Sequence, residues 1–179
     1  MYRILLTGLV SMTLMGTIAK AQESLDRYTA SNGLVVSDQD SITIGVGSLP
    51  DGSYQYIYMS SLISPLSTSN IDYCRTNFKL QAGQEGTTVA VRKIKRANGK
   101  VYAFVPLGGS TSFIIEIEEA ISGCELAFCR PAGYLNQQQF EKLILMRDAY
   151  KSGNLSEERF YELRNEFLET ADPEPEHLE

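Results

Sequence analysis

Residues 87–106 constrain the fold of this 179-residue chain more than any other part of its sequence. Two β-branched and aromatic runs are joined there by Asn98-Gly99, the dipeptide most typical of a two-residue hairpin turn. With that loop, Ala97 faces Lys100, and the strand pairing follows outward from this pair. Both faces of the hairpin are apolar at the open end and cationic toward the turn, so we predict a buried base and a solvated tip.

The first 21 residues are typical of a cleavable secretory signal peptide. Arg3 supplies a positive start, residues 4–18 are largely apolar, and Ala19-Lys20-Ala21 has the spacing of small residues found at cleavage sites. The stretch is too short and too weakly apolar for a stable membrane span, and an uncleaved anchor is the alternative. We therefore predict a bacterial protein that is periplasmic or secreted, with no transmembrane segment after cleavage.

The charge of the chain argues against general nucleic-acid binding. The full sequence has 16 basic and 22 acidic residues, a formal charge of −6. Removal of Arg3 and Lys20 with the signal peptide leaves 14 basic residues and a charge of −8. An acidic exported chain lacks the basic surface that the phosphate backbone requires, so no nucleic-acid partner is expected.

Regularly spaced turn signals predict a β-rich domain over residues 22–134. Residues 41–46 alternate as a strand does, Leu49-Pro50-Asp51-Gly52 reads as a tight turn, and residues 112–117 read as a further strand. Gly45 and Gly47 permit a bend or a close backbone approach. The expected fold class is α+β: a small antiparallel β barrel or sandwich of about five to seven strands, followed by a C-terminal helical hairpin.

The hairpin of helices is predicted over residues 135–170. Apolar residues recur there with a helical period, and Ser152-Gly153-Asn154 interrupts the pattern. Ser156 is a good N-cap for the second helix. Residues 171–179 are rich in Pro and acidic residues and are predicted to be a disordered acidic tail.

Three cysteines, Cys74, Cys124 and Cys129, would enter an oxidising compartment after export. A Cys124–Cys129 bridge closes a very short loop, worth about 2 kcal/mol, whereas a bridge from Cys74 closes about 50 residues and is worth about 4 kcal/mol. The preferred prediction is a disulfide from Cys74 to either of the other two. A metal site is disfavoured because the only histidine, His177, lies in the acidic tail.

The second predicted helix resembles the bacterial short C-terminal domain (SHOCT). The resemblance is carried by Gly153-Asn154-Leu155-Ser156-Glu157-Glu158-Arg159-Phe160, followed by Arg164 and Phe167-Leu168. That family typically shows Gly-x-Ile-Thr-x-Glu-Glu-Phe, then a basic residue and two apolar ones; here Arg159 replaces the usual acid. The resemblance covers about 30 residues, and it implies self-association or tethering rather than catalysis.

Three further stretches are similar to an exported bacterial β-domain family that has no established activity. They read SITIGVGSLPDGSYQYI, VRKIKRANGKVY and IEEAIS. This resemblance implies a compact β domain and nothing about chemistry.

Two surfaces are candidate binding sites. A cation cluster at the hairpin tip could hold an anionic lipid headgroup or an acidic partner; it comprises Arg92, Lys93, Lys95, Arg96 and Lys100. The simpler interpretation is a solvated tip whose lysines discourage edge pairing, and attraction to the acidic helices is a third possibility. The helix pair offers an apolar seam for a protein partner: Phe160, Leu163, Phe167 and Leu168.

Two other features favour structural roles. Tyr54, Tyr56 and Tyr58 are expected to project to one half-buried strand face, with a ligand-stacking platform as the alternative. Glu116, Glu118 and Glu119 are expected on a solvated element without a common partner, and no histidine in the folded part activates a serine. We predict a non-enzymatic exported interaction or self-association (oligomerisation) protein without a cofactor; the alternative is an envelope protein that binds a ligand or anionic lipid through the hairpin tip.

Overall fold

The computed structural model describes residues 23–60, 75, 79–108, 111–126, 129–130 and 133–170. The predicted signal peptide, Cys74 and the predicted acidic tail lie outside the described residues.

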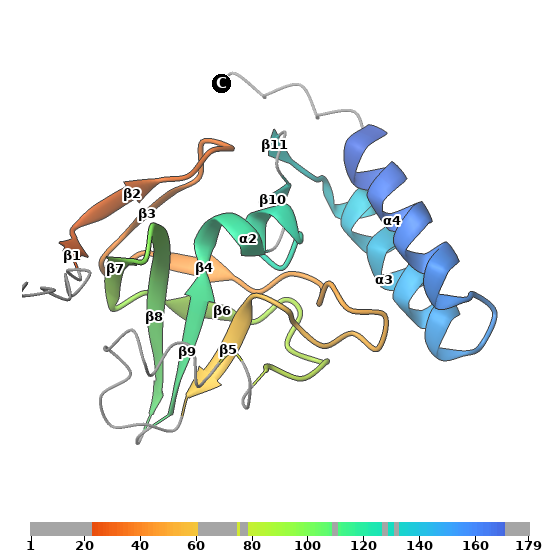
Figure 1. The fold of residues 1–179 in the computed structure, drawn as a ribbon, viewed down its shortest axis with the longest axis horizontal. Helices are drawn as coiled ribbons and strands as arrows, with labels where there is room; N and C mark the ends of the chain where they lie inside the picture. Colours follow the sequence, from red (N-terminus) through yellow and green to blue (C-terminus); the bar gives the residue numbers. More distant parts are fainter. Residues whose placement is uncertain are drawn as a thin grey trace, which may run out of the picture.

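The described chain is α+β, with antiparallel strands followed by a pair of C-terminal helices (Figure 1). The largest sheet has five strands in the order β1-β7-β8-β9-β5, and the remaining strands pair two by two. The strands are β1 (Glu23–Leu25), β2 (Arg27–Thr29), β3 (Val35–Ser37), β4 (Ser41–Thr43), β5 (Ile57–Ser60), β6 (Thr88–Ala90), β7 (Lys93–Ala97), β8 (Lys100–Gly108), β9 (Thr111–Glu116), β10 (Cys129–Arg130) and β11 (Gly133–Tyr134). The helices are α2 (Ile117–Ser122), α3 (Gln137–Lys151) and α4 (Glu157–Thr170).

The hairpin of β7 and β8 has the predicted turn and the predicted register near that turn. Ala97 lies opposite Lys100, and the pairing continues to Lys93 opposite Phe104. Asn98 and Gly99 both have positive φ, at 53° and 80°. Two consecutive positive φ angles match the right-handed twist of the strands, which explains why this dipeptide closes the hairpin.

The base of the hairpin differs from the prediction. Arg92 is the first residue of this segment to bond to β8: its N–H donates to the Phe104 carbonyl at 2.8 Å. The preceding strand, β6, does not pair with β8 and pairs instead with β4, with Val89 opposite Ile42. The apolar residues before Lys93 therefore pack across the face of the large sheet rather than extending one of its strands, because that placement buries Val89 and Val91 in the core.

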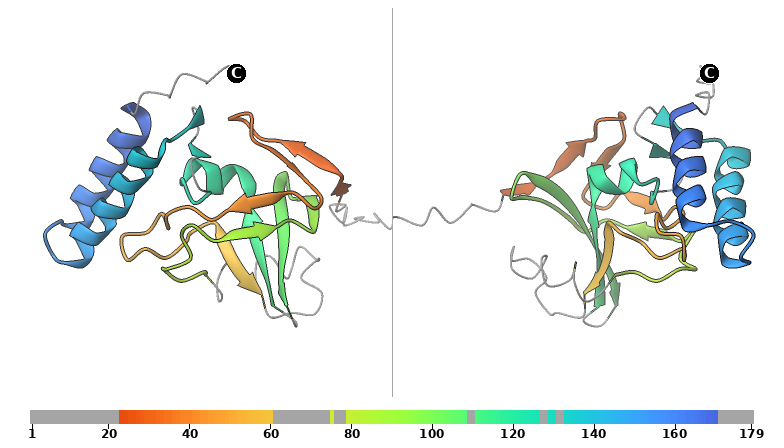
Figure 2. Two further views of the ribbon diagram at one scale, coloured as in Figure 1. Left: turned by 180° about the vertical axis from the view of Figure 1, so that it is seen from behind. Right: turned by 45° about the vertical axis from the view of Figure 1, so that its right-hand side comes forward.

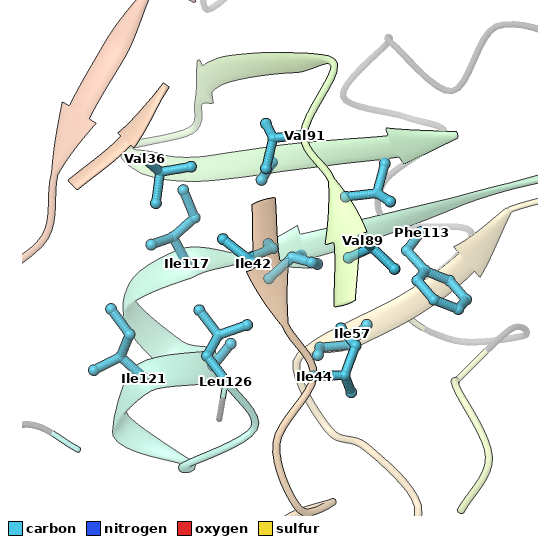
Figure 3. Packing of buried hydrophobic residues seen from close by; sticks show 14 of the residues in the cluster. Val36, Ile42, Ile44, Ile57, Val89, Val91, Phe113, Ile117, Ile121 and Leu126 are labelled. Carbon is cyan, nitrogen blue, oxygen red and sulfur yellow. The ribbon is translucent and has the colours of Figure 1, made fainter. Parts of the chain in front are cut away.

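Two apolar clusters fill the two faces of the large sheet. In the main core, side chains from β4, β6 and α2 meet those of β5 and β9 (Figure 3). A smaller cluster on the opposite face comprises Tyr58, Ala97, Tyr102, Phe104 and Ile114. The described strands form an open sheet, with β1 and β5 at its edges, and no closed barrel.

The tyrosine row does not share one strand face. β5 begins only at Ile57, and the N–H groups of Gln55 and Tyr56 donate to the Glu125 carboxylate at 2.6 and 2.8 Å. Tyr54 consequently lies in the main core, whereas Tyr58 lies in the cluster on the opposite face. The prediction of a single tyrosine face was wrong because the carboxylate of Glu125 replaces a strand partner at this point.

The helix pair packs against the β domain along one side of the molecule (Figure 2). Helices α3 and α4 lie side by side, and Phe140, Leu143 and Leu168 form a cluster with Val46 and Cys124 of the β domain. α3 begins with a reciprocal capping box between Asn136 and Gln139. Two short helices are marginal in isolation, so this buried cluster stabilises them.

Candidate functional site

The hairpin tip does not present its five cations as one surface. Lys93, Lys95 and Lys100 occupy the face of Tyr102 and Phe104, as alternation along paired strands requires. Arg96 points to the other face and forms an ion pair with Glu23 at 2.8 Å. The cluster that looks continuous in the sequence is therefore divided between two sides of the sheet.

Lys100 is committed to an internal ion pair. Its ammonium group contacts the buried Glu116 carboxylate and reaches Glu119 at 3.3 Å. The bond to Glu116 raises the pKa of Lys100 and is the largest cause of that shift. The expectation that Glu116 and Glu119 have no common partner was therefore wrong, since both contact Lys100. The expectation of solvated carboxylates was wrong for Glu116, which is 1% exposed. Glu116 lies opposite Tyr102 in the β8–β9 pairing, and Lys100 lies two residues from Tyr102 on β8. The ion pair therefore crosses diagonally between neighbouring strands, which spacing along one strand does not reveal.

Glu118 has a separate structural role. It accepts hydrogen bonds from the Tyr28 hydroxyl and from the Ser31 hydroxyl, the latter at 2.6 Å. Burial, assisted by this carboxylate, raises the pKa of Tyr28 to about 12. The contact fastens α2 to the β2–β3 ribbon.

The remaining tip cations are less constrained. Within the described part of the chain, Arg92 and Lys93 form no ion pair. Burial lowers the pKa of Lys95, and the neighbouring Lys93 lowers it further. A pair of cations, rather than five, is thus available to an anionic surface.

The predicted helix seam lies largely inside the molecule. Phe160 and Leu168 are buried, at 1% and 8% exposure, while Leu163 and Phe167 are half-buried. Phe160 packs against the rings of Tyr150 and Tyr161, with centroid distances of 6.0 and 5.5 Å. The seam therefore joins the two helices to each other and to the β domain, and little of it faces outward.

Two arginines of the helix pair are buried, which the sequence analysis did not predict, although Arg164 belongs to the motif that resembles the short C-terminal domain. Arg147 of α3 contacts Glu85 and Asp148, and Arg164 of α4 donates to the Gly123 carbonyl. Each occupies a position that continues the apolar stripe of its helix: Arg147 follows Leu143 by four residues, and Arg164 follows Phe160 by four. An arginine at a position of the apolar stripe is the feature of the sequence that could have predicted a buried polar contact.

Glu125 is the most buried carboxylate of the junction, with 0% exposure. It accepts bonds from the Ser48 hydroxyl and from the backbone N–H groups of Ser48, Gln55 and Tyr56. Burial raises its pKa, although these bonds act in the opposite direction. The side chain therefore ties the loop before β5 to the end of α2.

Cys124 is also buried, beside Val46 and Leu143. The side chains of Cys74 and Cys129 lie outside the described residues, so the predicted disulfide remains a prediction. In the described residues, no three histidine, cysteine or acidic side chains are grouped as a metal site would require.

An open cleft lies where the β domain meets the helix pair, with a volume of about 250 Å³. Three segments line it: the 49–52 turn, the end of α3 and the start of α4. The lining residues are Leu49, Pro50, Asp51, Tyr150, Glu157 and Tyr161. Two aromatic rings and two carboxylates, far apart in the sequence, thus meet at one place.

The turn that forms one wall has the predicted geometry. The Gly52 N–H donates to the Leu49 carbonyl at 2.8 Å, and Gly52 has a φ of 82°. A Cβ at Gly52 would lie 2.8 Å from Cδ of Arg147, so glycine also allows α3 to pack beneath the turn. Close packing of turn and helix holds the two sides of the cleft together.

Polar contacts position the groups around this cleft. The Ser53 hydroxyl and N–H donate to Oδ1 of Asp51, and the hydroxyl bond is the main reason that the pKa of Asp51 is lowered. Burial, followed by the negative charge of Glu157, raises the pKa of the Tyr161 phenol. The cleft is therefore acidic, and the Tyr161 phenol stays neutral.

Comparisons with protein-family models, curated proteins and solved structures found no match. None of them bears on the resemblance to the short C-terminal domain or to the exported β-domain family, and both remain predictions. Across the described residues, each helix is too short or too polar to cross a membrane.

Proposed function

We propose that this chain is an exported, non-enzymatic interaction protein whose C-terminal helix pair and β domain together form the recognition surface. The observation that carries this proposal is the cleft between the 49–52 turn and the two helices. Aromatic side chains with a polar end are favoured at protein interfaces, and two of them line this cleft.

The arrangement of buried charges supports binding rather than catalysis. Glu125 accepts three backbone N–H bonds, Glu116 holds Lys100, and Arg164 is bonded to a backbone carbonyl. A catalytic acid or base needs a free position directed at a substrate. These groups instead connect segments of the fold.

Site-specific photo-crosslinking tests the proposed surface. A photoreactive amino acid at Asn154, exposed between α3 and α4, is compared with one at Ala90, exposed on β6. We expect a defined adduct from position 154 in the exporting bacterium and none from position 90. Excess purified chain without the photoreactive group must remove this adduct by competition. If the adduct has twice the mass of the chain, sedimentation velocity must also show a dimer.

Equal adducts from both positions, or adducts from position 90 alone, would contradict a recognition surface at the helix pair. A monomer at all concentrations, together with a heavier or lighter foreign partner, would exclude self-association while retaining the interaction role.

A second candidate function is binding to anionic envelope lipid through Arg92 and Lys93. It is favoured by the absence of an ion pair at these two cations within the described chain. Each cation near an anionic surface contributes about 1 kcal/mol, so the double alanine variant should lose about 20- to 30-fold in vesicle affinity. Flotation with phosphatidylglycerol vesicles measures this; unchanged flotation rules the candidate out.

A further inference from the structure

The carboxylates of the cleft are not neutralised by ion pairs within the described part of the chain. Asp51 accepts both Ser53 bonds at Oδ1 and forms no ion pair with any described residue. Glu157, exposed at the start of α4, forms no ion pair with any described residue. Lys151 lies close enough to lower the pKa of Asp51 but makes no ion pair with it. Among the described residues, therefore, no ion pair neutralises either carboxylate of the cleft.

The aromatic wall is held in place before any ligand arrives. Tyr150 and Tyr161 both pack against Phe160, at interplanar angles of 55° and 73°. Phe160 is 1% exposed, so its ring is fixed by the interior. Rings that are already ordered reduce the entropy lost on binding, which favours recognition by a small cleft.

This combination of groups selects a cation. A guanidinium or ammonium group is attracted to the face of a tyrosine ring and forms charge-assisted bonds with carboxylates. A neutral sugar also stacks on tyrosine, but it gains less from two carboxylates that form no ion pair with the described residues. The acidic chain, with a formal charge of −6, attracts cations toward the surface.

We propose that the cleft of Asp51, Tyr150, Glu157 and Tyr161 binds an arginine or lysine side chain, or a free amine of the same chemistry. The inference rests on the proposed function, since it assigns the chemistry of the partner group that the junction recognises. The binding step itself requires only the full chain and a small cation.

The test is a titration of the full chain, with ¹³C-labelled tyrosine rings, followed by NMR. The probes are Nα-acetylarginine amide, Nα-acetyllysine amide and the neutral isostere Nα-acetylcitrulline amide; cadaverine and a basic decapeptide distinguish a free amine from a polypeptide source. We expect the cations, and not citrulline, to shift the ring signals of Tyr150 and Tyr161.

Matched variants locate the charge. Glu157→Gln should weaken arginine amide binding about 2- to 5-fold, as expected for one exposed charge pair. Glu158→Gln makes the same change one residue along, in the same helix turn but outside the cleft, and should leave binding within measurement error. Tyr161→Phe should retain binding because the ring face remains.

Binding of citrulline amide as tight as arginine amide, or an equal loss in Glu158→Gln, would overturn the proposal. So would a neutral oligosaccharide that shifts the same rings undiminished in Glu157→Gln. If no cation shifts the tyrosine signals while crosslinks from position 154 persist, the proposed function stands and the cation site is wrong. If the cations bind but position 154 gives no crosslink, the cation site stands and the proposed recognition surface is wrong.

Discussion

At the scale of single residues, the polar side chains buried at the junction are its most specific features. Arg164 is 5% exposed, donates to the Gly123 carbonyl and lies near Glu125. Burial lowers the pKa of its guanidinium. Removing such a group leaves a buried carbonyl without its donor and Glu125 without a nearby positive charge.

Arg164→Ala should therefore lower the free energy of unfolding by about 2–4 kcal/mol, because a buried charge-assisted bond is lost. Urea unfolding followed by circular dichroism measures the change. Arg159→Ala is the matched control: Arg159 belongs to the same helix, but its ion pair with Glu162 is exposed and should contribute about 0.5 kcal/mol or less. An equal loss of unfolding free energy in the two variants would show that the buried bond of Arg164 contributes no more than an exposed ion pair.

The pH dependence of stability should carry a contribution from Glu125. Its pKa is raised in the folded state, so the folded chain holds this proton more tightly than the unfolded chain does. The stabilising contribution is present below the ordinary value of 4.5 and is lost as pH rises through the folded pKa. In Glu125→Gln, unfolding free energy should fall less steeply with pH across that window than in the wild type. An unchanged slope, matching that of Glu162→Gln, would contradict this.

At the scale of elements, the β7–β8 hairpin is determined by its turn. Asn98 and Gly99 both adopt positive φ, which an L-residue with a Cβ tolerates poorly. The rest of the sheet is assembled on β8, which pairs with β7 on one side and β9 on the other.

Gly99→Ala should destabilise the protein by about 1–2 kcal/mol, since alanine must adopt the left-handed conformation at this position. Asn98→Gly provides the opposite change at the neighbouring residue, removes the Cβ from a positive-φ site, and should alter stability by less than about 0.5 kcal/mol. Thermal unfolding of both variants gives the comparison. Similar stabilities for Gly99→Ala and the wild type would mean that the turn relaxes to another type.

At the scale of the whole molecule, the docking of the helix pair decides what the surface offers. Arg147 connects α3 to Glu85 and lies against Gly52, so it contacts both the β domain and the wall of the cleft. The apolar cluster that includes Val46, Leu143 and Leu168 completes the junction.

Arg147→Ala should selectively loosen the helix pair. Hydrogen–deuterium exchange should become about 10-fold faster or more in α3 and α4, corresponding to the loss of about 1.4 kcal/mol or more in opening free energy, while β8 and β9 stay protected. Lys142→Ala, which removes a side chain 5.8 Å from the Phe167 ring, is the control and should change exchange little. Uniformly faster exchange in helices and sheet would indicate one cooperative unit.

Local patterns determined the α+β class, the hairpin turn and the two C-terminal helices. These depend on contacts between residues near in sequence, namely backbone conformation at Asn98-Gly99, strand alternation and helical period. The exported location, the disulfide and the resemblance to the short C-terminal domain remain predictions from the same patterns.

Contacts between residues far apart in sequence depend on the tertiary fold. That fold divides the cations of the hairpin tip, pairs Lys100 with Glu116 and places β6 on β4. It also buries most of the seam that was predicted to bind a partner. It also places Asp51 beside Tyr150 and Tyr161 in one cleft, although Tyr161 follows Asp51 by more than a hundred residues in the sequence. These contacts depend on how apolar faces are shared between distant elements, and a sequence period specifies that a face is buried without specifying what covers it.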